Sequence, residues 1–312
     1  MVMMSLSSAT NRWPADGQSG PSFDARGRSS RYPARCVHAA GGARTTTMAK
    51  KLQIGQRQAN RICQMSAADR LAFIAEGLPI IHASAKGFWS ASLELNAMPR
   101  EAEVLEGFAK EEAAKILILL DVVRCPEKHV AGKLSTLIER FYGHLERLIY
   151  AQLAEWWSED IARLRKVVEP LRTTHDLEGS MGEFIVPNST LYRRESKLYA
   201  DVEAYEDGTP LWNAPAGHQN PFGRRMPAVV AVIKAMAACG MFTLAGLQAS
   251  SQVWGELEFK ERETLWDAER LTRELLERLI AEGLPQESAT QDHVDTLYRH
   301  WPLPMLTSAL SP

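Results

Sequence analysis

The sequence of 312 residues predicts an all-α fold, a helical bundle with a small β-hairpin or loop insertion. Two observations predict the helices. Apolar residues recur at steps of three and four over most of the chain after Ser66, which is the period of an amphipathic helix. Pro99, Pro126 and Pro170 stand near the ends of these apolar runs. A third observation predicts the insertion, because residues 180–215 contain short strand-like runs separated by turn residues.

The composition is that of a protein with a sizeable core. Apolar residues make up 45% and charged residues 24% of the chain. A formal net charge of −2 excludes a strongly basic protein that binds nucleic acid through overall charge, although not a local basic site. The cysteines are widely spaced and form no CxxC pair, so neither a disulfide framework nor a structural zinc site is predicted. We therefore expect a cytoplasmic protein with no metal and no other cofactor.

The charge divides the chain into a basic N-terminal segment and an acidic body. Residues 1–51 hold eight Lys and Arg against two acids, a sum of +6, which leaves −8 for the other 261 residues. Residues 1–47 show no apolar period and are predicted to be a disordered tail. The alternatives are a targeting segment, or upstream sequence preceding a true start at Met48. Residues 52–282 are expected to form the helical domain and residues 283–312 an irregular tail with one short helical turn.

The first two helices are expected to meet near residue 98. Ser66 stands three residues before Asp69, a weak capping box, and opens a helix that runs to residues 96–98 with Pro79 inside it. The second helix is expected from Pro99 to Val123. Its stretch Ile116–Leu120 is apolar on all sides, which predicts that this end is deeply buried.

Three further helices complete the expected bundle. One runs from about His129 to Val168, with at most one break, and Pro170 marks its end. Helices are also expected over residues 227–257 and 259–282, the latter with a charged outer face. Residues 228–249 carry one charge and could span a membrane, but their Ala and Gly content favours a buried core helix.

The predicted insertion is a small hairpin or ordered loop. The runs Glu183–Val186 and Lys197–Val202 are strand-like, and Asn188 and Asp207–Gly208 are turn signals. The charged residues between Tyr192 and Asp201 are then expected to lie on the exposed face of a hairpin.

Two pairs of residues could carry chemistry. Glu111 and Lys115 are four apart and share a helix face directly before the most apolar stretch, although a plain surface ion pair is the alternative. Arg140 and His144 are also four apart. His can move a proton near neutral pH and Arg can hold phosphate oxygens, so this pair could act on a phosphodiester without a metal. An Arg and a His that merely decorate the helix surface are the alternative.

Together these segments resemble the AbiV-type abortive infection family, which belongs to the HEPN superfamily. The order is a long amphipathic helix, a second helix with an E-E-x-x-K signature, a long helix with Arg and His, and a (K/R)-x-x-x-L-Y-V-D segment. The resemblance covers about residues 66–215, with Ala200 in place of the usual Val. The matching residues, which would support the site or bind substrate, are Glu111, Glu112 and Lys115 in the second helix, and Ser196–Val202, with Tyr199 and Asp201, in the later segment.

The resemblance implies antiphage defence by a helical protein that often forms dimers. Many HEPN proteins are metal-independent endoribonucleases with an Arg-x(4–6)-His motif at the dimer interface. If the roles of this motif apply to this chain, Arg140 would bind the phosphate and His144 would transfer the proton, although only three residues separate them. Arg124 and His129 have four residues between them, but Pro126 intervenes, so we prefer the pair that one continuous helix would hold.

Two functions from different classes remain open. The first is a HEPN-type endoribonuclease, or a toxin directed at RNA or the translation machinery. The second is a non-catalytic dimeric interaction protein on the same scaffold, which the short Arg–His spacing and the acidic body favour. Both imply a second copy of the chain as partner, leave room for a regulatory protein, and involve no membrane.

Overall fold

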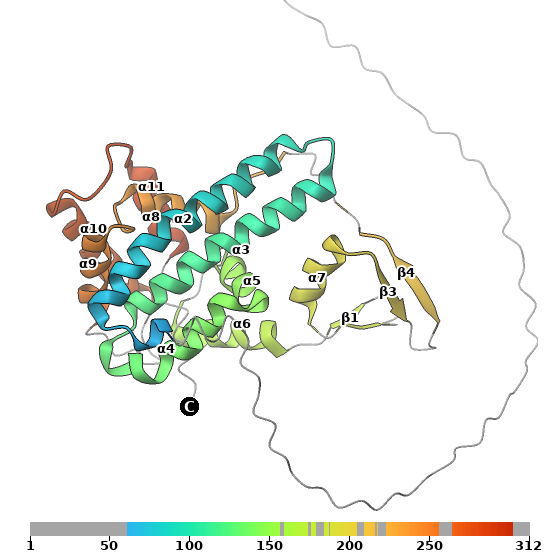
Figure 1. The fold of residues 1–312 in the computed structure, drawn as a ribbon, viewed down its shortest axis with the longest axis horizontal. Helices are drawn as coiled ribbons and strands as arrows, with labels where there is room; N and C mark the ends of the chain where they lie inside the picture. Colours follow the sequence, from blue (N-terminus) through green and yellow to red (C-terminus); the bar gives the residue numbers. More distant parts are fainter. Residues whose placement is uncertain are drawn as a thin grey trace, which may run out of the picture. The chain divides into compact units, whose positions relative to one another are not determined.

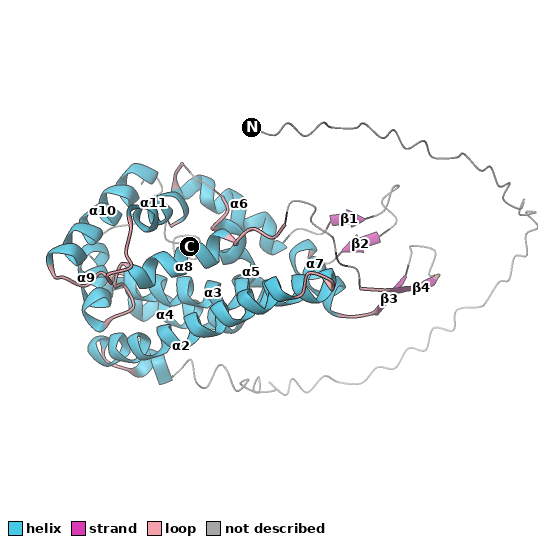
Figure 2. Ribbon diagram, turned by 90° about the horizontal axis from the view of Figure 1, so that it is seen from above, coloured by secondary structure: helices cyan, strands magenta, loops and turns pink. Residues whose placement is uncertain are grey.

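The computed structural model describes residues 61–156, 159–173, 176–178, 184–186, 188–204, 209–215, 217, 223–255 and 264–301. Helices make up most of these residues, and the strands form two short two-stranded sheets (Figure 2), so the predicted all-α class with a small β insertion is confirmed. The expected N-terminal tail and the start at Met48 lie outside the described residues.

Helices α2 (Ala67–Glu94) and α3 (Pro99–Arg124) are the longest elements and lie side by side (Figure 1). The predicted cap is confirmed, since Ser66 Oγ accepts a hydrogen bond from the Asp69 amide at 3.1 Å and donates one to its carboxylate at 2.7 Å. Pro99 opens α3, as expected. Every side chain of Ile116–Leu120 is buried, so this end of α3 forms part of the core as predicted.

The prediction of a helix from His129 to Val168 with at most one break is wrong. The chain forms α4 (Glu127–Tyr142), α5 (His144–Leu153) and α6 (Ile161–Thr173), with two interruptions rather than one. Gly143 is extended, at φ −81° and ψ 126°, and separates α4 from α5. Pro170 lies inside α6 rather than at its end. The break at Gly143 falls between the two residues that the sequence placed on one continuous helix.

The insertion contains a helix between two hairpins. Strand β1 (Asp176–Glu178) pairs antiparallel with β2 (Phe184–Val186), then α7 (Ser189–Leu198) follows, and β3 (Asp201–Ala204) pairs with β4 (Pro210–Asn213). The predicted strand at Glu183–Val186 is confirmed in β2. The predicted strand at Lys197–Val202 is wrong at Lys197 and Leu198, which end α7, and is confirmed at Asp201 and Val202, which begin β3.

The Asn188 side chain explains why a helix starts where a turn was expected. Its Oδ1 accepts a hydrogen bond from the Leu191 amide at 3.0 Å, the contact of an N-terminal cap, and its Nδ2 donates to the Leu171 carbonyl of α6 at 3.0 Å. The cap therefore begins α7 and ties it to α6.

The helix predicted over residues 227–257 is divided into α8 (Ala228–Ala238) and α9 (Leu244–Gly255). Gly240 allows the break with its φ of +82°. A Cβ there would stand 2.3 Å from the Leu284 carbonyl oxygen, so the close approach of the two segments also requires glycine. Most of α8 is buried, which agrees with the core interpretation of residues 228–249.

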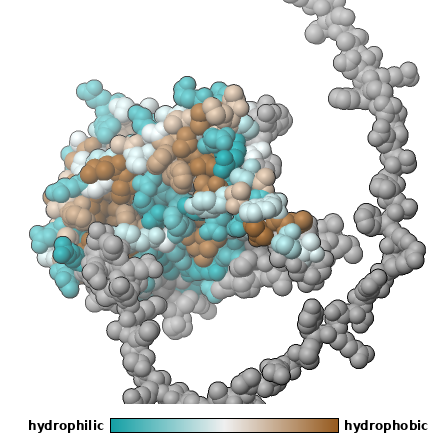
Figure 3. Space-filling view, turned by 45° about the vertical axis from the view of Figure 1, so that its right-hand side comes forward, coloured by the Kyte–Doolittle hydropathy of each residue, from teal (hydrophilic) through white to brown (hydrophobic). Residues whose placement is uncertain are grey.

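Within the described ranges, no helix is both long enough and apolar enough to cross a membrane. On the face shown in Figure 3, apolar side chains form separate brown patches divided by teal and white ones. The charged outer face predicted for the last long helix is confirmed in α10 (Leu265–Ala281), where Arg270 and Glu274 are exposed.

The C-terminal segment is more ordered than the sequence predicted. Helix α11 (Gln291–His300) has ten residues and packs against α8, where an irregular tail with one helical turn was expected. Leu297 and Trp301 are buried in the same core as α2, α3 and α8. The helical unit therefore extends past residue 282, to at least Trp301.

Candidate functional site

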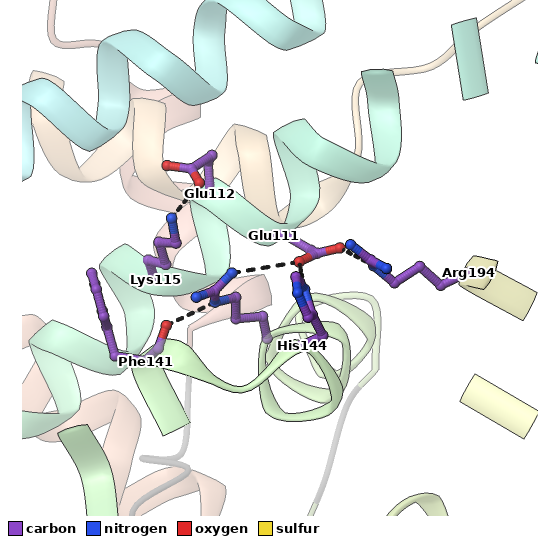
Figure 4. A network of polar contacts seen from close by, with 7 residues as sticks. Glu111, Glu112, Lys115, Phe141, His144 and Arg194 are labelled. Carbon is purple, nitrogen blue, oxygen red and sulfur yellow. Dashed lines mark hydrogen bonds and ion pairs between the residues drawn. The ribbon is translucent and has the colours of Figure 1, made fainter. Parts of the chain in front are cut away.

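The buried carboxylate of Glu111 is the centre of a polar cluster between α3, α5 and α7 (Figure 4). Its Oε2 lies 2.7 Å from His144 Nδ1, at the start of α5. Its Oε1 accepts a hydrogen bond from Arg194 Nε of α7 at 2.5 Å. A third group, Arg147 Nη1, lies 3.6 Å from Oε2. One carboxylate with an exposed fraction of only 5% thus receives an imidazole and two guanidinium groups.

The break at Gly143 positions the two α5 residues of this cluster. Because the helix restarts at His144, that residue and Arg147 stand three apart in the first turn of α5 and share a face toward α3. Arg147 Nε also donates to the Phe141 carbonyl at 2.7 Å, on the other side of the break. Burial lowers the pKa of Arg147, while the nearby carboxylates of Glu111 and Glu112 raise it.

The Glu111–His144 contact determines which proton the imidazole carries. An ionised carboxylate only accepts hydrogen bonds, so we assign the Nδ1 proton to His144 and leave Nε2 as the basic nitrogen. The His144 side chain is 53% exposed, which lets a substrate reach it. A carboxylate behind an accessible imidazole is an arrangement suited to general acid–base catalysis.

Glu111 and Lys115, which the sequence placed on one helix face, do not form the ion pair that was the alternative to a functional role. Lys115 forms its ion pair with Glu112 instead, and its ammonium lies 5.6 Å from the centre of the Phe141 ring. The side chain of Glu111 points into the cluster because three cationic or polar groups from two other helices meet it there. Glu112 and Lys115 therefore line the edge of the site rather than its centre.

Arg140 does not reach the position expected of a phosphate-binding residue. Arg140 lies in the last turn of α4 and is only 7% exposed. Its Nε is 3.6 Å from the Glu146 carboxylate. Arg172 of α6 holds the same carboxylate through two hydrogen bonds of 3.1 Å. Arg140 is thus part of a buried structural ion-pair network, whereas His144, four residues later, faces the solvent.

The alternative pair is also unfavourable. Arg124 is only 2% exposed, is paired with Asp121, and lies against the rings of Trp254 and Trp301. The side chain of His129 lies outside the described residues.

Tyr199 and Asp201 lie on the exposed surface after α7. Tyr199 is 60% exposed, and Asp201 Oδ1 accepts a hydrogen bond from the next amide, that of Val202, at 2.8 Å. In the part of the chain that the structure describes, neither residue contacts Glu111 or His144. The segment contributes Arg194 to the site instead.

Two arginines of the site were not predicted. Arg194 stands four residues before Leu198, which is the spacing of the (K/R)-x-x-x-L-Y pattern, so a stricter alignment of that motif could have found it. No sequence pattern pointed to Arg147, because its proximity to His144 and Glu111 depends on where α5 begins.

Comparison with known proteins gave no match: no family model, no curated protein and no solved structure matches this chain. Among the residues described, no three or more His, Cys, Asp or Glu side chains are grouped as ligands of a metal ion would be.

Proposed function

We propose that this protein is a cytoplasmic, RNA-directed defence toxin of the AbiV kind, in which His144 cleaves RNA without a metal. The observation that carries the proposal is the 2.7 Å contact between His144 Nδ1 and the buried carboxylate of Glu111, with half of the imidazole exposed. The resemblance of residues 66–215 to AbiV-type proteins supports the role in defence. A second copy of the chain and a regulatory protein are the expected partners.

The proposed reaction is an internal transfer at phosphorus. His144 Nε2 removes the proton from the ribose 2′-hydroxyl, and the 2′ oxygen forms a bond to phosphorus. The bond between phosphorus and the 5′ oxygen breaks, and that oxygen takes the proton back from the imidazolium. The products are a 2′,3′-cyclic phosphate and a 5′-hydroxyl end. Glu111 stabilises the imidazolium while it exists.

Arg147 is the proposed phosphate-binding residue, in place of Arg140. It stands three residues from His144 on the same helix face, and its guanidinium lies at 3.6 Å from Glu111, looser than a direct hydrogen bond. A phosphate entering beside His144 could therefore receive hydrogen bonds from this guanidinium.

A second candidate is a non-catalytic dimeric interaction protein. The burial of Arg140 favours it, because the expected Arg–His pair does not face the solvent together. The acidic body, with −8 outside the first 51 residues, also disfavours long-range attraction of RNA. This candidate predicts a stable dimer and no cleavage of RNA.

The test is induced expression of the full chain in a bacterial host, as wild type, His144→Gln and His293→Gln. The last is a matched control, since His293 is a partly exposed residue of α11, far along the chain from the site, and Gln suits its position in a capping box. We expect growth arrest and new RNA fragments with 5′-hydroxyl ends in the wild type and the control, and neither in His144→Gln. Circular dichroism checks that all three are folded.

Two results would contradict catalysis by His144. Fragments that persist in folded His144→Gln would place the activity elsewhere. Arrest without fragments in all three chains would exclude cleavage and support the non-catalytic candidate.

A further inference from the structure

A pocket of about 830 Å³ opens beside the Glu111 cluster. Helices α3, α5 and α7 line it together with Arg224 and Arg225, which precede α8. Ligand pockets in proteins commonly measure roughly 300 to 1,000 Å³, so this one is large enough for a small organic molecule. Of its lining residues, the function proposed above uses only Glu111.

The walls of the pocket carry more positive than negative charge. They contain six cations against four carboxylates, those of Glu103, Glu106, Glu111 and Glu155. The excess of two positive charges contrasts with the acidic body of the chain. The cations are Lys110, Arg193, Arg194, Lys197, Arg224 and Arg225.

Four of the cations are already paired with pocket carboxylates. The Glu106 carboxylate forms ion pairs with Lys110 Nζ at 2.6 Å and with Arg224 Nη1 at 2.9 Å. The other two pairs are Lys197 with Glu103 at 2.9 Å and Arg194 with Glu111 at 2.5 Å. These four cations share three carboxylates, so one positive charge is left over, and the ion pairs hold the walls in place.

Arg193 and Arg225 are the two remaining cations of the pocket. Both are exposed, and within the described ranges neither forms an ion pair or a side-chain hydrogen bond. Two free guanidinium groups at one pocket are donors of the kind that phosphate groups bind through paired hydrogen bonds.

Most of the remaining lining is apolar, apart from Gln152 and Thr190. Phe108 of α3, Leu148 of α5 and Leu198 of α7 contribute apolar and aromatic surface. Gly107 lies on the same wall, and a Cβ placed on it would meet no atom within 4 Å, so open space lies in front of this residue. A bare inorganic anion would leave most of this volume and its apolar surface unused.

We propose that this pocket binds a nucleoside phosphate, with the phosphates at Arg193 and Arg225 and the base or sugar against the apolar wall. The ligand could be a free nucleotide or one nucleotide of an RNA strand, since both present the same groups. Glu111 and Arg194 belong both to this pocket and to the His144 cluster, so an occupant lies directly behind the carboxylate that orients His144.

Gly107→Leu tests the pocket without removing any charge. The new side chain fills the open space, and replacing a helical glycine favours the helix. Gly87→Leu in α2 is the matched control, because a Cβ there also meets nothing within 4 Å and this glycine does not line the pocket. The full chain is titrated with ADP, with inorganic phosphate and with a single-stranded RNA hexamer by calorimetry.

We expect ADP or the hexamer to bind the wild type and Gly87→Leu, with inorganic phosphate at least tenfold weaker. Gly107→Leu should lose at least tenfold in affinity while keeping its melting temperature. Binding of ADP identifies a free nucleotide as ligand, and binding of the hexamer alone identifies an RNA strand. Equal binding by Gly107→Leu and the control, or no binding by the wild type, would overturn the proposal.

A second pair of variants tests the role of charge. Arg193→Ala/Arg225→Ala should weaken binding at least tenfold and reduce its dependence on salt. Arg270→Ala/Arg278→Ala removes the same charge from exposed positions of α10 and should leave binding unchanged. An equal loss in both double variants would show that only overall charge matters. Because binding is measured, a failure of RNA cleavage would leave this result unaffected.

Discussion

Glu111 and His144 stand 33 residues apart, on helices that meet in the fold, and their contact defines the candidate site. The E-E-x-x-K signature suggested that Glu111 matters, and the four-residue spacing from Arg140 suggested the same of His144. Their contact with one another was not predicted, because helical spacing relates residues within one helix only. Arg140, by contrast, was predicted to act and is buried in an ion-pair network with Glu146.

Glu111→Gln should destabilise the protein by about 3 kcal/mol, because Arg147 and Arg194 would lose the carboxylate that they share in a mostly buried site. Urea unfolding followed by circular dichroism measures this change. Glu112→Gln is the matched control at the next position. Its side chain is more exposed and, among the described residues, forms an ion pair with Lys115 only, so a loss below ~1 kcal/mol is expected. Equal losses in the two variants would contradict the central position of Glu111.

Element boundaries were predicted well where a local signal determines them. Ser66 and Pro99 begin their helices as expected, since a cap and a proline at the first turn act through neighbouring backbone atoms. The breaks at Gly143 and Gly240 were missed, because each lies inside a continuous apolar run. Whether a helix continues through a glycine depends on what packs against it, and that is a tertiary question.

Gly240→Ala should cost more than about 2 kcal/mol, since the methyl group would combine a left-handed backbone with an overlap against the Leu284 carbonyl. Gly283→Ala separates these two effects. Its φ is +66°, but a Cβ there meets no atom within 4 Å, so a loss of roughly 1 kcal/mol is expected. Thermal unfolding of both variants measures the difference, and a smaller loss at Gly240 would contradict the close approach of the two segments.

At the scale of the helical unit, one buried polar network joins α3, α5 and Trp301, which follows α11. Asp121 and Arg124 of α3 are paired, and the Tyr150 hydroxyl of α5 donates to Asp121 at 2.8 Å. Burial, together with the adjacent carboxylate, raises the pKa of Tyr150 well above its ordinary value, so the hydroxyl keeps its proton. The Trp301 ring covers the Arg124 guanidinium at 4.1 Å. The C-terminal segment therefore closes the core over a buried charge.

A chain ended after Ser288 should be destabilised by at least about 4 kcal/mol, or roughly 10 °C in melting temperature, because the core loses Leu297 and Trp301. Removal of residues 1–47, which composition predicts to be disordered, should leave the melting temperature unchanged. Should the shortened chain fail to accumulate, Leu297→Ala provides the same test at about 3 kcal/mol. Full stability of the chain ended after Ser288 would show that α11 is dispensable.

The sequence alone determined the helical class, the first two helices with their boundaries, the buried end of α3 and the position of the strand β2. Each depends on local periodicity, capping or proline chemistry, which neighbouring residues decide among themselves. Only the tertiary structure decided that Glu111 meets His144, Arg147 and Arg194, that Arg140 is buried, and that α11 joins the core. These outcomes depend on which helix faces pack together, and packing partners lie far apart in the chain.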